Sequence, residues 1–314
     1  MLLKPLLLSC LCLGIFTTHT AVAESIKIDG KLNIDNRNIS GLVITNDFMA
    51  LATDEGNAIQ ILRKQGNKYI ADSTGVIELS TSKDELDLEG LAWQAPYLYA
   101  IGSHSKKRKR VKSNASDEKN LKRLEPIIAE PSREQLFQVE LSPTGDVKQI
   151  RSLSLSKWLQ QNPILAPFLA IPSKENGIDI EGIAVNKNQL TIGFRGPVLR
   201  GNLATVMRFE LDAKRFKLQR PELKMLNLGG FGIRDLAAQD DEILILAGPV
   251  NEVPNQYSLF RWNGENRFAE LKAEFQIKDK IVKGKPEAIA LDAKQRLWLG
   301  QDGLKDGAIE RLEF

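Results

Sequence analysis

The chain has 314 residues, and its 43 basic and 40 acidic side chains leave a formal net charge of +3 at pH 7. A charge this close to balance gives no general attraction to nucleic acid or to a membrane surface, so we expect no nucleic-acid partner. The length suits one large all-β domain or two ordinary domains.

The first 23 residues have the pattern of a secretory signal peptide: a basic start, an apolar run from Leu6 to Phe16, and small residues at a cleavage site before Glu24. The run is too short to cross a bilayer, which takes roughly 20 apolar residues. A lipid anchor at Cys10 is the alternative. We therefore expect a periplasmic or secreted domain over residues 24–314, without a transmembrane segment.

Both cysteines, Cys10 and Cys12, lie in the segment that would be removed. The mature domain would then have neither disulfides nor thiol chemistry, which excludes thiol-dependent enzymes and disulfide-stabilised scaffolds. Its stability must come from a packed core.

After the cleavage site, residues 26–34 alternate apolar and polar side chains with period two, which predicts a half-buried strand. Short apolar runs separated by turn-forming residues follow through most of the chain. They predict strands over residues 48–52, 58–62, 69–71, 182–185, 190–194, 205–211, 217–226, 236–238, 243–247, 258–262, 269–277, 288–291, 297–300 and 308–314.

Two segments break this pattern. Residues 105–134 are highly charged, with the basic run Lys-Lys-Arg-Lys-Arg-Val-Lys at 106–112, and we expect a strandless basic loop there. A short helix is predicted at about 156–161, ended by Asn162-Pro163.

One phrase recurs along the chain. Leu-Asp-Leu-Glu-Gly-Leu-Ala-Trp at 86–93 returns as Ile-Asp-Ile-Glu-Gly-Ile-Ala-Val at 178–185, with weaker copies at 38–43, 232–237 and 285–290. One position of the phrase, which we call the slot, holds in turn Ser40, Glu89, Glu181, Arg234 and Glu287. The steps between slots are 49, 92, 53 and 53 residues. Three of these steps are near the roughly 40–50 residues of a four-stranded propeller blade. The long step of 92 residues contains the charged segment at 105–134 and the short helix at about 156–161, which we interpret as insertions into one blade.

The sequence therefore predicts an all-β fold, a single five-bladed β-propeller of four-stranded antiparallel blades. The last repeat is one strand short, and we expect the strand at 26–34 to close the ring. Six blades are the alternative if the long step holds two of them. A β-sandwich would not explain a motif that returns at a constant step.

The polar side chains should meet at one mouth of the central channel. The second strand of a blade runs antiparallel to the first, so it ends at the same end of the blade where the first strand begins. The residues fourteen or fifteen positions after each slot, called partner positions here, should therefore lie beside the slots. They are Asp54, His104, Arg195, Gly248 and Asp302, and Asp235 is a further candidate for the channel mouth.

Three glutamates in a narrow mouth repel one another unless a cation binds, a carboxyl keeps its proton, or arginines pair with them. Oxygen ligands without cysteine favour Ca²⁺ or Mg²⁺, so Glu89, Glu181 and Glu287 are candidate metal ligands. Arg195 and Arg234 offer the other solution and would leave a place for a small anionic ligand. No organic cofactor is indicated.

The candidate catalytic residues are His104, Glu89, Arg195 and Arg234. In an ester or phosphoester hydrolase, an arginine or a metal would polarise the ester, and His104 or Glu89 would activate water. The alternative is a non-catalytic interaction propeller whose channel is plugged by salt bridges and whose blades contact a protein partner. In either case we expect a monomer.

Five short phrases carry a family resemblance: Asp-Leu-Glu-Gly at 87–90, Gly-Ser-His-Ser at 102–105, Asp-Ile-Glu-Gly at 179–182, Gly-Phe-Arg-Gly-Pro at 193–197 and Gly-Ile-Arg-Asp at 232–235. With them the chain resembles an exported bacterial family known only as domain of unknown function 3616. The resemblance implies the propeller fold and brings no activity. More loosely, the chain is similar to the calcium-dependent esterase, phytase and lactonase propellers, which implies a metal held by channel carboxylates.

Overall fold

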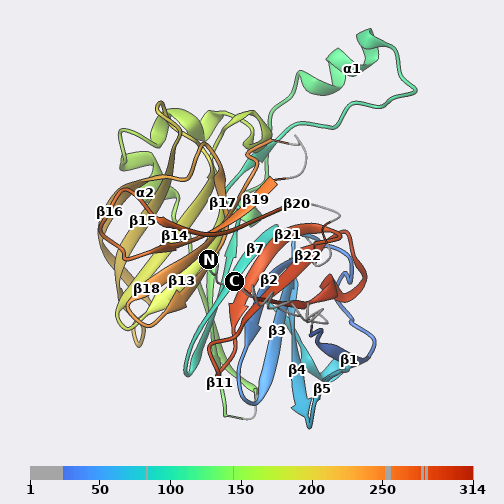
Figure 1. The fold of residues 1–314 in the computed structure, drawn as a ribbon. Coiled ribbons are helices and arrows are strands. Elements are labelled where there is room, and N and C mark those ends of the chain that lie inside the picture. Colours follow the sequence, from blue (N-terminus) through green and yellow to red (C-terminus); the bar gives the residue numbers. More distant parts are fainter. Residues whose placement is uncertain are drawn as a thin grey trace, which may run out of the picture.

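The computed structural model describes residues 24–82, 84–143, 145–251, 256–276, 279 and 282–313. Its blades are five sheets set in a ring around a common axis, the architecture of a five-bladed β-propeller (Figure 1). The predicted fold is confirmed, and the six-blade alternative is wrong. The expected signal peptide lies outside the described residues.

Each blade runs outward from an inner strand that lines the axis. The first blade holds β2 (Ile39–Ile44), β3 (Phe48–Thr53), β4 (Ala58–Gln65), and β5 (Lys68–Ala71) and β6 (Val76–Glu78), which both pair with β4. The second holds β7 (Leu88–Gln94), β8 (Tyr97–Gly102), β11 (Leu136–Leu141) and β12 (Val147–Leu153). The third holds β13 (Asp179–Asn186), β14 (Gln189–Gly196), β15 (Leu203–Asp212) and β16 (Lys217–Asn227). The fourth holds β17 (Gly232–Gln239), β18 (Glu242–Gly248), β19 (Gln256–Trp262) and β20 (Glu270–Gln276), and the fifth β21 (Lys285–Leu291), β22 (Leu297–Asp302) and β23 (Glu310–Leu312).

The ring closes through the N-terminal segment, with one difference from the expectation. Ser25 forms an antiparallel bridge with Glu310 of β23, and the amide of Ile26 donates to the carbonyl of Ile309 over 3.0 Å. The strand that follows, β1 (Lys27–Gly30), is shorter than predicted and pairs in parallel with β5 of the first blade. The segment therefore links the last blade to the first.

The long step between the second and third slots contains two insertions. The prediction of a strandless loop for the first insertion is wrong. This insertion forms a small antiparallel pair of β9 (Lys106–Lys107) and β10 (Ile128–Ala129), with helix α1 (Asp117–Leu124) between them. This arm projects from the ring, and α1 buries none of its residues (Figure 1). The second insertion holds α2 (Ser156–Gln161), over the residues where the sequence predicts a helix, and the 3₁₀ turns η3 (Ala166–Ala170) and η4 (Ser173–Glu175). Further 3₁₀ turns are η1 (Ser73–Gly75), η2 (Pro131–Arg133) and η5 (Lys305–Ala308).

The core lies between the blades. Among the described residues, the buried apolar side chains fall into five clusters, and each cluster joins two neighbouring blades around the ring. No helix in the described ranges is long and apolar enough to cross a membrane.

The residue after each slot decides how closely neighbouring inner strands approach. It is Gly41, Gly90 and Gly182 in the first three blades. A Cβ on Gly90 would lie 2.9 Å from the backbone oxygen of Glu181, and one on Gly182 would lie 2.8 Å from Cγ of Leu236. The glycine of the repeated Glu-Gly phrase is thus required by packing between blades.

Gly90→Ala should destabilise the fold, because its new methyl group meets backbone atoms that cannot move aside without separating two blades. We expect a loss of about 1–3 kcal/mol in the free energy of unfolding, measured by urea denaturation. Gly300→Ala is the matched control, since its Cβ would lie 3.3 Å from the small side chain of Ala288 and further from other atoms. Equal losses in the two variants would contradict this account.

Candidate functional site

The slot residues enter the channel because each inner strand carries an extra residue there. A β-bulge leaves one residue without a partner across the ladder and turns its side chain in a new direction. In every blade the pairing of the first two strands shifts at the slot, between Ile39 and Gly41, Leu88 and Gly90, Ile180 and Gly182, Ile233 and Asp235, and Pro286 and Ala288.

A cavity of about 430 Å³ opens at this end of the channel, and we call it the mouth cavity. The structure brings together all five slot residues and three of the partner-position residues in its wall. These are Ser40, Glu89, Glu181, Arg234 and Glu287 with Asp54, Arg195 and Asp302. The remaining lining residues are Asn38, Ile39, Arg110, Lys174, Pro249, Asn251, Tyr257 and Lys285.

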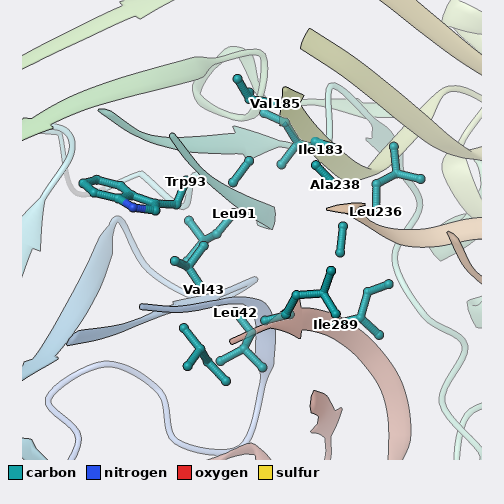
Figure 2. Close-up of a pocket in the computed structure, with 15 residues that line it drawn as sticks. Leu42, Val43, Leu91, Trp93, Ile183, Val185, Leu236, Ala238 and Ile289 are labelled. Atoms are coloured by element: carbon teal, nitrogen blue, oxygen red, sulfur yellow. The ribbon is translucent and has the colours of Figure 1, made fainter. Parts of the chain in front are cut away.

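The other end of the channel is apolar. Two residues beyond each slot, the inner strands place Leu42, Leu91, Ile183, Leu236 and Ile289 around a space of about 120 Å³ (Figure 2). The channel is therefore polar at one end and apolar at the other.

A chain of buried ion pairs crosses the floor of the mouth cavity. Nη1 of Arg195 lies 2.5 Å from Oε1 of Glu181, and Nε of Arg234 lies 3.0 Å from Oε2 of the same carboxylate. Arg195 also pairs with Asp179, and Arg234 pairs with Glu287. Acidic and basic groups thus alternate through five side chains from the third blade to the fifth.

Burial works against the charge of the central carboxylate in this chain. It raises the pKa of Glu181 to about 7, although Arg195 and Arg234 pull the pKa down. The arginines are accordingly needed to hold a charged group where water cannot reach it.

The wall formed by the first two blades lacks such pairs. The side chain of Glu89 makes no ion pair or hydrogen bond with a described residue, and Oδ1 of Asp54 is buried without a hydrogen-bond partner in the same part of the chain. In the second blade the neighbouring arginine is Arg133, at the end of the insert. It binds Asp87 over 2.6 Å and also pairs with Glu85. Glu89 therefore makes no ion pair with Arg133, although its charge still interacts with Arg133 and Arg195.

Both unpaired acids hold their protons more strongly than usual. Burial raises the pKa of Asp54 to about 7, and repulsion adds to it from Asp87, Asp302, Glu55 and Glu287. Burial also raises the pKa of Glu89 well above its ordinary value, with repulsion from Asp87, Glu181, Asp179 and Asp54. In its protonated form, which Asp54 adopts below about pH 7, such a carboxyl can donate a hydrogen bond.

Tyr257 reaches the cavity through a gap left by a glycine. The partner position of the fourth blade is Gly248, where a Cβ would lie 2.7 Å from Cδ1 and Cε1 of the Tyr257 ring and 3.1 Å from Cγ of Arg234. The phenol comes from β19, the third strand of the blade. Burial raises its pKa to about 12, so the hydroxyl stays a donor at neutral pH.

Two predicted residues do not line the cavity. His104 is buried, Nε2 accepts from the amide of Leu155 over 3.1 Å, and Nδ1 therefore donates to the carbonyl of Gly102 over 2.9 Å. Asp235 accepts from the amides of Leu236 and Ile289, each over 2.7 Å, and so joins the fourth blade to the fifth. The structure places both residues in supporting positions, away from the predicted channel mouth.

The carboxylates do not fit a metal site. No group of three or more His, Cys, Asp or Glu side chains among the described residues could hold a metal ion. Of the three glutamates predicted as ligands, Glu181 is bound by two arginines and Glu287 by one. We therefore derive no chemistry through Ca²⁺ or Mg²⁺.

Sequence reasoning missed several residues in and behind the cavity. Asp179, which pairs with Arg195 in the floor, belongs to the repeated phrase two residues before the slot, and its repetition at Asp87 was the available signal. Tyr257 and the rim residue Lys174 come from outside the inner strands and carried no such signal. Arg110, also at the rim, belongs to the basic run at 106–112 that the sequence already singled out.

The comparison with protein families decides the relationship. The model described as "Protein of unknown function (DUF3616)" matches residues 38–295. The chain belongs to this family. No curated protein sequence matches the DUF3616 chain significantly.

Several solved structures are similar to the DUF3616 chain. The Malassezia sympodialis allergen Mala s 1 matches with a TM-score of 0.52 and 10% identity, over 90% of this chain and 95% of that one. Myxococcus xanthus glutaminyl cyclase matches with a TM-score of 0.46 and 10% identity, over 88% and 93%. Virginiamycin B lyase from Staphylococcus aureus matches with a TM-score of 0.37 and 12% identity, over 93% and 70%. At these identities, the likeness to the allergen shows the fold alone.

Removing one arginine from the buried chain should destabilise the DUF3616 protein strongly. Arg234→Met leaves Glu181 and Glu287 without a shared cation, and we expect a loss of about 3–5 kcal/mol in the free energy of unfolding. Arg261→Met is the control, because Arg261 is more exposed and pairs with Glu270 at the surface. Its loss should stay below about 1 kcal/mol in the same urea denaturation.

His104 should make the protein less stable in mild acid. Burial lowers the pKa of His104 from 6.5 to about 4. Below pH 6.5 the imidazole of His104 is protonated in the unfolded chain but stays neutral in the folded chain. The free energy of unfolding therefore keeps its full value above pH 6.5 and declines as the pH falls toward 4. The decline from this group should approach about 3 kcal/mol. Melting curves of the wild type and His104→Gln from pH 7 to 4.5 test it, and parallel losses in the two proteins would contradict the assignment.

Proposed function

We propose that the mouth cavity of this DUF3616 propeller binds a small anionic ligand carrying a carboxylate or phosphate group. The observation that supports this most is the pair Asp54 and Glu89, two acids of the cavity lining that make no ion pair with a described residue. In their protonated forms they donate hydrogen bonds to an oxyanion, as does the hydroxyl of Tyr257.

The charge of the cavity depends on these two protons. Its lining holds five basic side chains, Arg110, Lys174, Arg195, Arg234 and Lys285, and five acidic ones, Asp54, Glu89, Glu181, Glu287 and Asp302. With Asp54 and Glu89 neutral, every other acid of the lining makes an ion pair, with Arg195, Arg234 or Lys285. An anion entering the cavity then meets no unpaired carboxylate, and Lys174 in the lining attracts it.

Hydrolysis of an ester or phosphoester is the reaction that the same groups would support. Tyr257 and a protonated carboxyl would stabilise the oxyanion that forms during attack, and Glu89 in its ionised form would accept a proton from water. Arg195 and Arg234 take the supporting role of fixing the floor of the cavity, because most of their donors are already used by carboxylates.

A non-catalytic interaction propeller is the second candidate. The buried ion pairs around Glu181 favour it, because they close the channel without any ligand. Under this alternative the cavity binds no anion, and partners contact the outer surfaces of the blades.

Binding of N-acetylglycine, which is a monoanion throughout the range tested, should weaken as the pH rises. Anion binding requires the protonated acids, so affinity is highest below the pKa of Asp54, about 7, and is lost above it. For one linked proton we expect about a tenfold rise in Kd between pH 6 and pH 8, measured by calorimetry. An affinity that rises with pH would point to a cationic ligand, and no heat at either pH would favour the plugged interaction module.

Variants separate the contribution of each donor. Asp54→Asn with Glu89→Gln keeps N–H donors but removes the titration, so its Kd should change little between pH 6 and pH 8. Tyr257→Phe should weaken binding about tenfold at pH 6, because one hydrogen bond to a charged group is lost. Asp47→Asn, an exposed acid away from the cavity, should behave as the wild type.

A further inference from the structure

A second hollow continues outward from the mouth cavity. It has a volume of about 660 Å³, and we call it the side groove. It shares three lining residues with the mouth cavity, Lys174, Pro249 and Asn251. Together the two volumes exceed the roughly 300–1,000 Å³ that is usual for small-molecule sites.

The wall between the two hollows belongs to the fourth blade. Gln256 and Tyr257 are consecutive residues at the start of β19, and successive side chains of a strand point in opposite directions. Tyr257 lines the mouth cavity and Gln256 lines the side groove. Pro249, just after β18, lines both. A ligand that fills the mouth cavity can therefore extend along the groove past this wall.

The groove differs from the cavity in its chemistry. Phe231, Val250 and Pro249 give it an apolar surface, and Gln256 adds an exposed amide. Lys174 stands at the junction with the cavity, beside Glu175, which pairs with Arg108 over 2.5 Å. Apolar surface interrupted by amides suits the side chains and peptide groups of a polypeptide.

The far end of the channel limits what can enter. The ion pairs around Glu181 lie beneath the mouth cavity, and beyond them the apolar ring of Leu42 and Leu91 encloses only about 120 Å³ (Figure 2). A polymer cannot thread through such a channel, so a chain that reaches the ion pairs at the floor of the cavity would do so with one of its ends.

We propose that the ligand is the C-terminal segment of a polypeptide, with its α-carboxylate in the mouth cavity and the preceding residues in the side groove. This extends the proposed function, on which it rests: the anion of the mouth cavity is the chain terminus. Capture of a terminal carboxylate combined with side-chain pockets is a known mode of peptide recognition.

A ladder of ligands tests the proposal on the full chain at pH 6. The probes are N-acetylglycine, the N-acetylated tetrapeptide Ala-Phe-Ala-Gly and the hexapeptide Ala-Leu-Ala-Phe-Ala-Gly, each as the free acid and as the C-terminal amide. We expect the hexapeptide acid to bind at least about tenfold more tightly than N-acetylglycine. We expect the hexapeptide amide to bind at least about tenfold more weakly than the hexapeptide acid.

A groove variant separates this inference from the proposed function. Gln256→Trp fills the side groove and should abolish the gain with peptide length, while the Kd of N-acetylglycine stays unchanged. Gln161→Trp, which lines neither hollow, is the matched control.

The outcomes are distinct. Binding of N-acetylglycine without any gain for longer peptides, or without an effect of amidation, overturns the peptide proposal and leaves the anion site standing. Absence of binding by every probe overturns both. If an oligogalacturonate binds more tightly than the hexapeptide acid, the peptide proposal is overturned and the ligand is an acidic sugar.

Discussion

The site depends on one local distortion that is repeated around the ring. At each slot the inner strand carries a residue that its neighbour cannot pair, and the bulge turns that side chain into the channel. The next residue must then fit against the adjacent inner strand, which is why Gly90 meets the backbone of Glu181 so closely. Placement of the polar groups and packing of the blades are thus two results of the same backbone geometry.

The five blades do not have the same ion pairs around their slots, and this difference decides which carboxylates in the cavity remain unpaired. Arg195 serves both Asp179 and Glu181, whereas Arg133 in the second blade serves Asp87 and Glu85 and does not reach Glu89. One side of the cavity is therefore a floor of ion pairs, and the other is a wall where the pKa values of Asp54 and Glu89 are raised by burial. A fully symmetric set of ion pairs would have left no group available to a ligand.

The sequence was sufficient for the blades and for most of the cavity. Recurrence of the slot phrase, with three of its four steps at 49 to 53 residues, located the inner strands, and the offset of fourteen or fifteen residues found Arg195, Asp54 and Asp302. The same offset failed at His104, because the chain leaves β8 at Gly102 and His104 adopts a positive φ of 53° that turns it toward Leu155. Tyr257 could not be found by this route, because it reaches the cavity through the space that Gly248 leaves empty.

Ring closure has a consequence for how the protein is made. Glu24 and Ile26 bond to the backbone on either side of Glu310, so residues from opposite ends of the chain complete one circle. Until the last strand joins the ring, the first and fourth blades keep unprotected flanks, and contacts of such long sequence separation form slowly. Copies in which the ring is still open should therefore be prone to aggregate, and truncation after the fourth blade should produce aggregates instead of a smaller propeller.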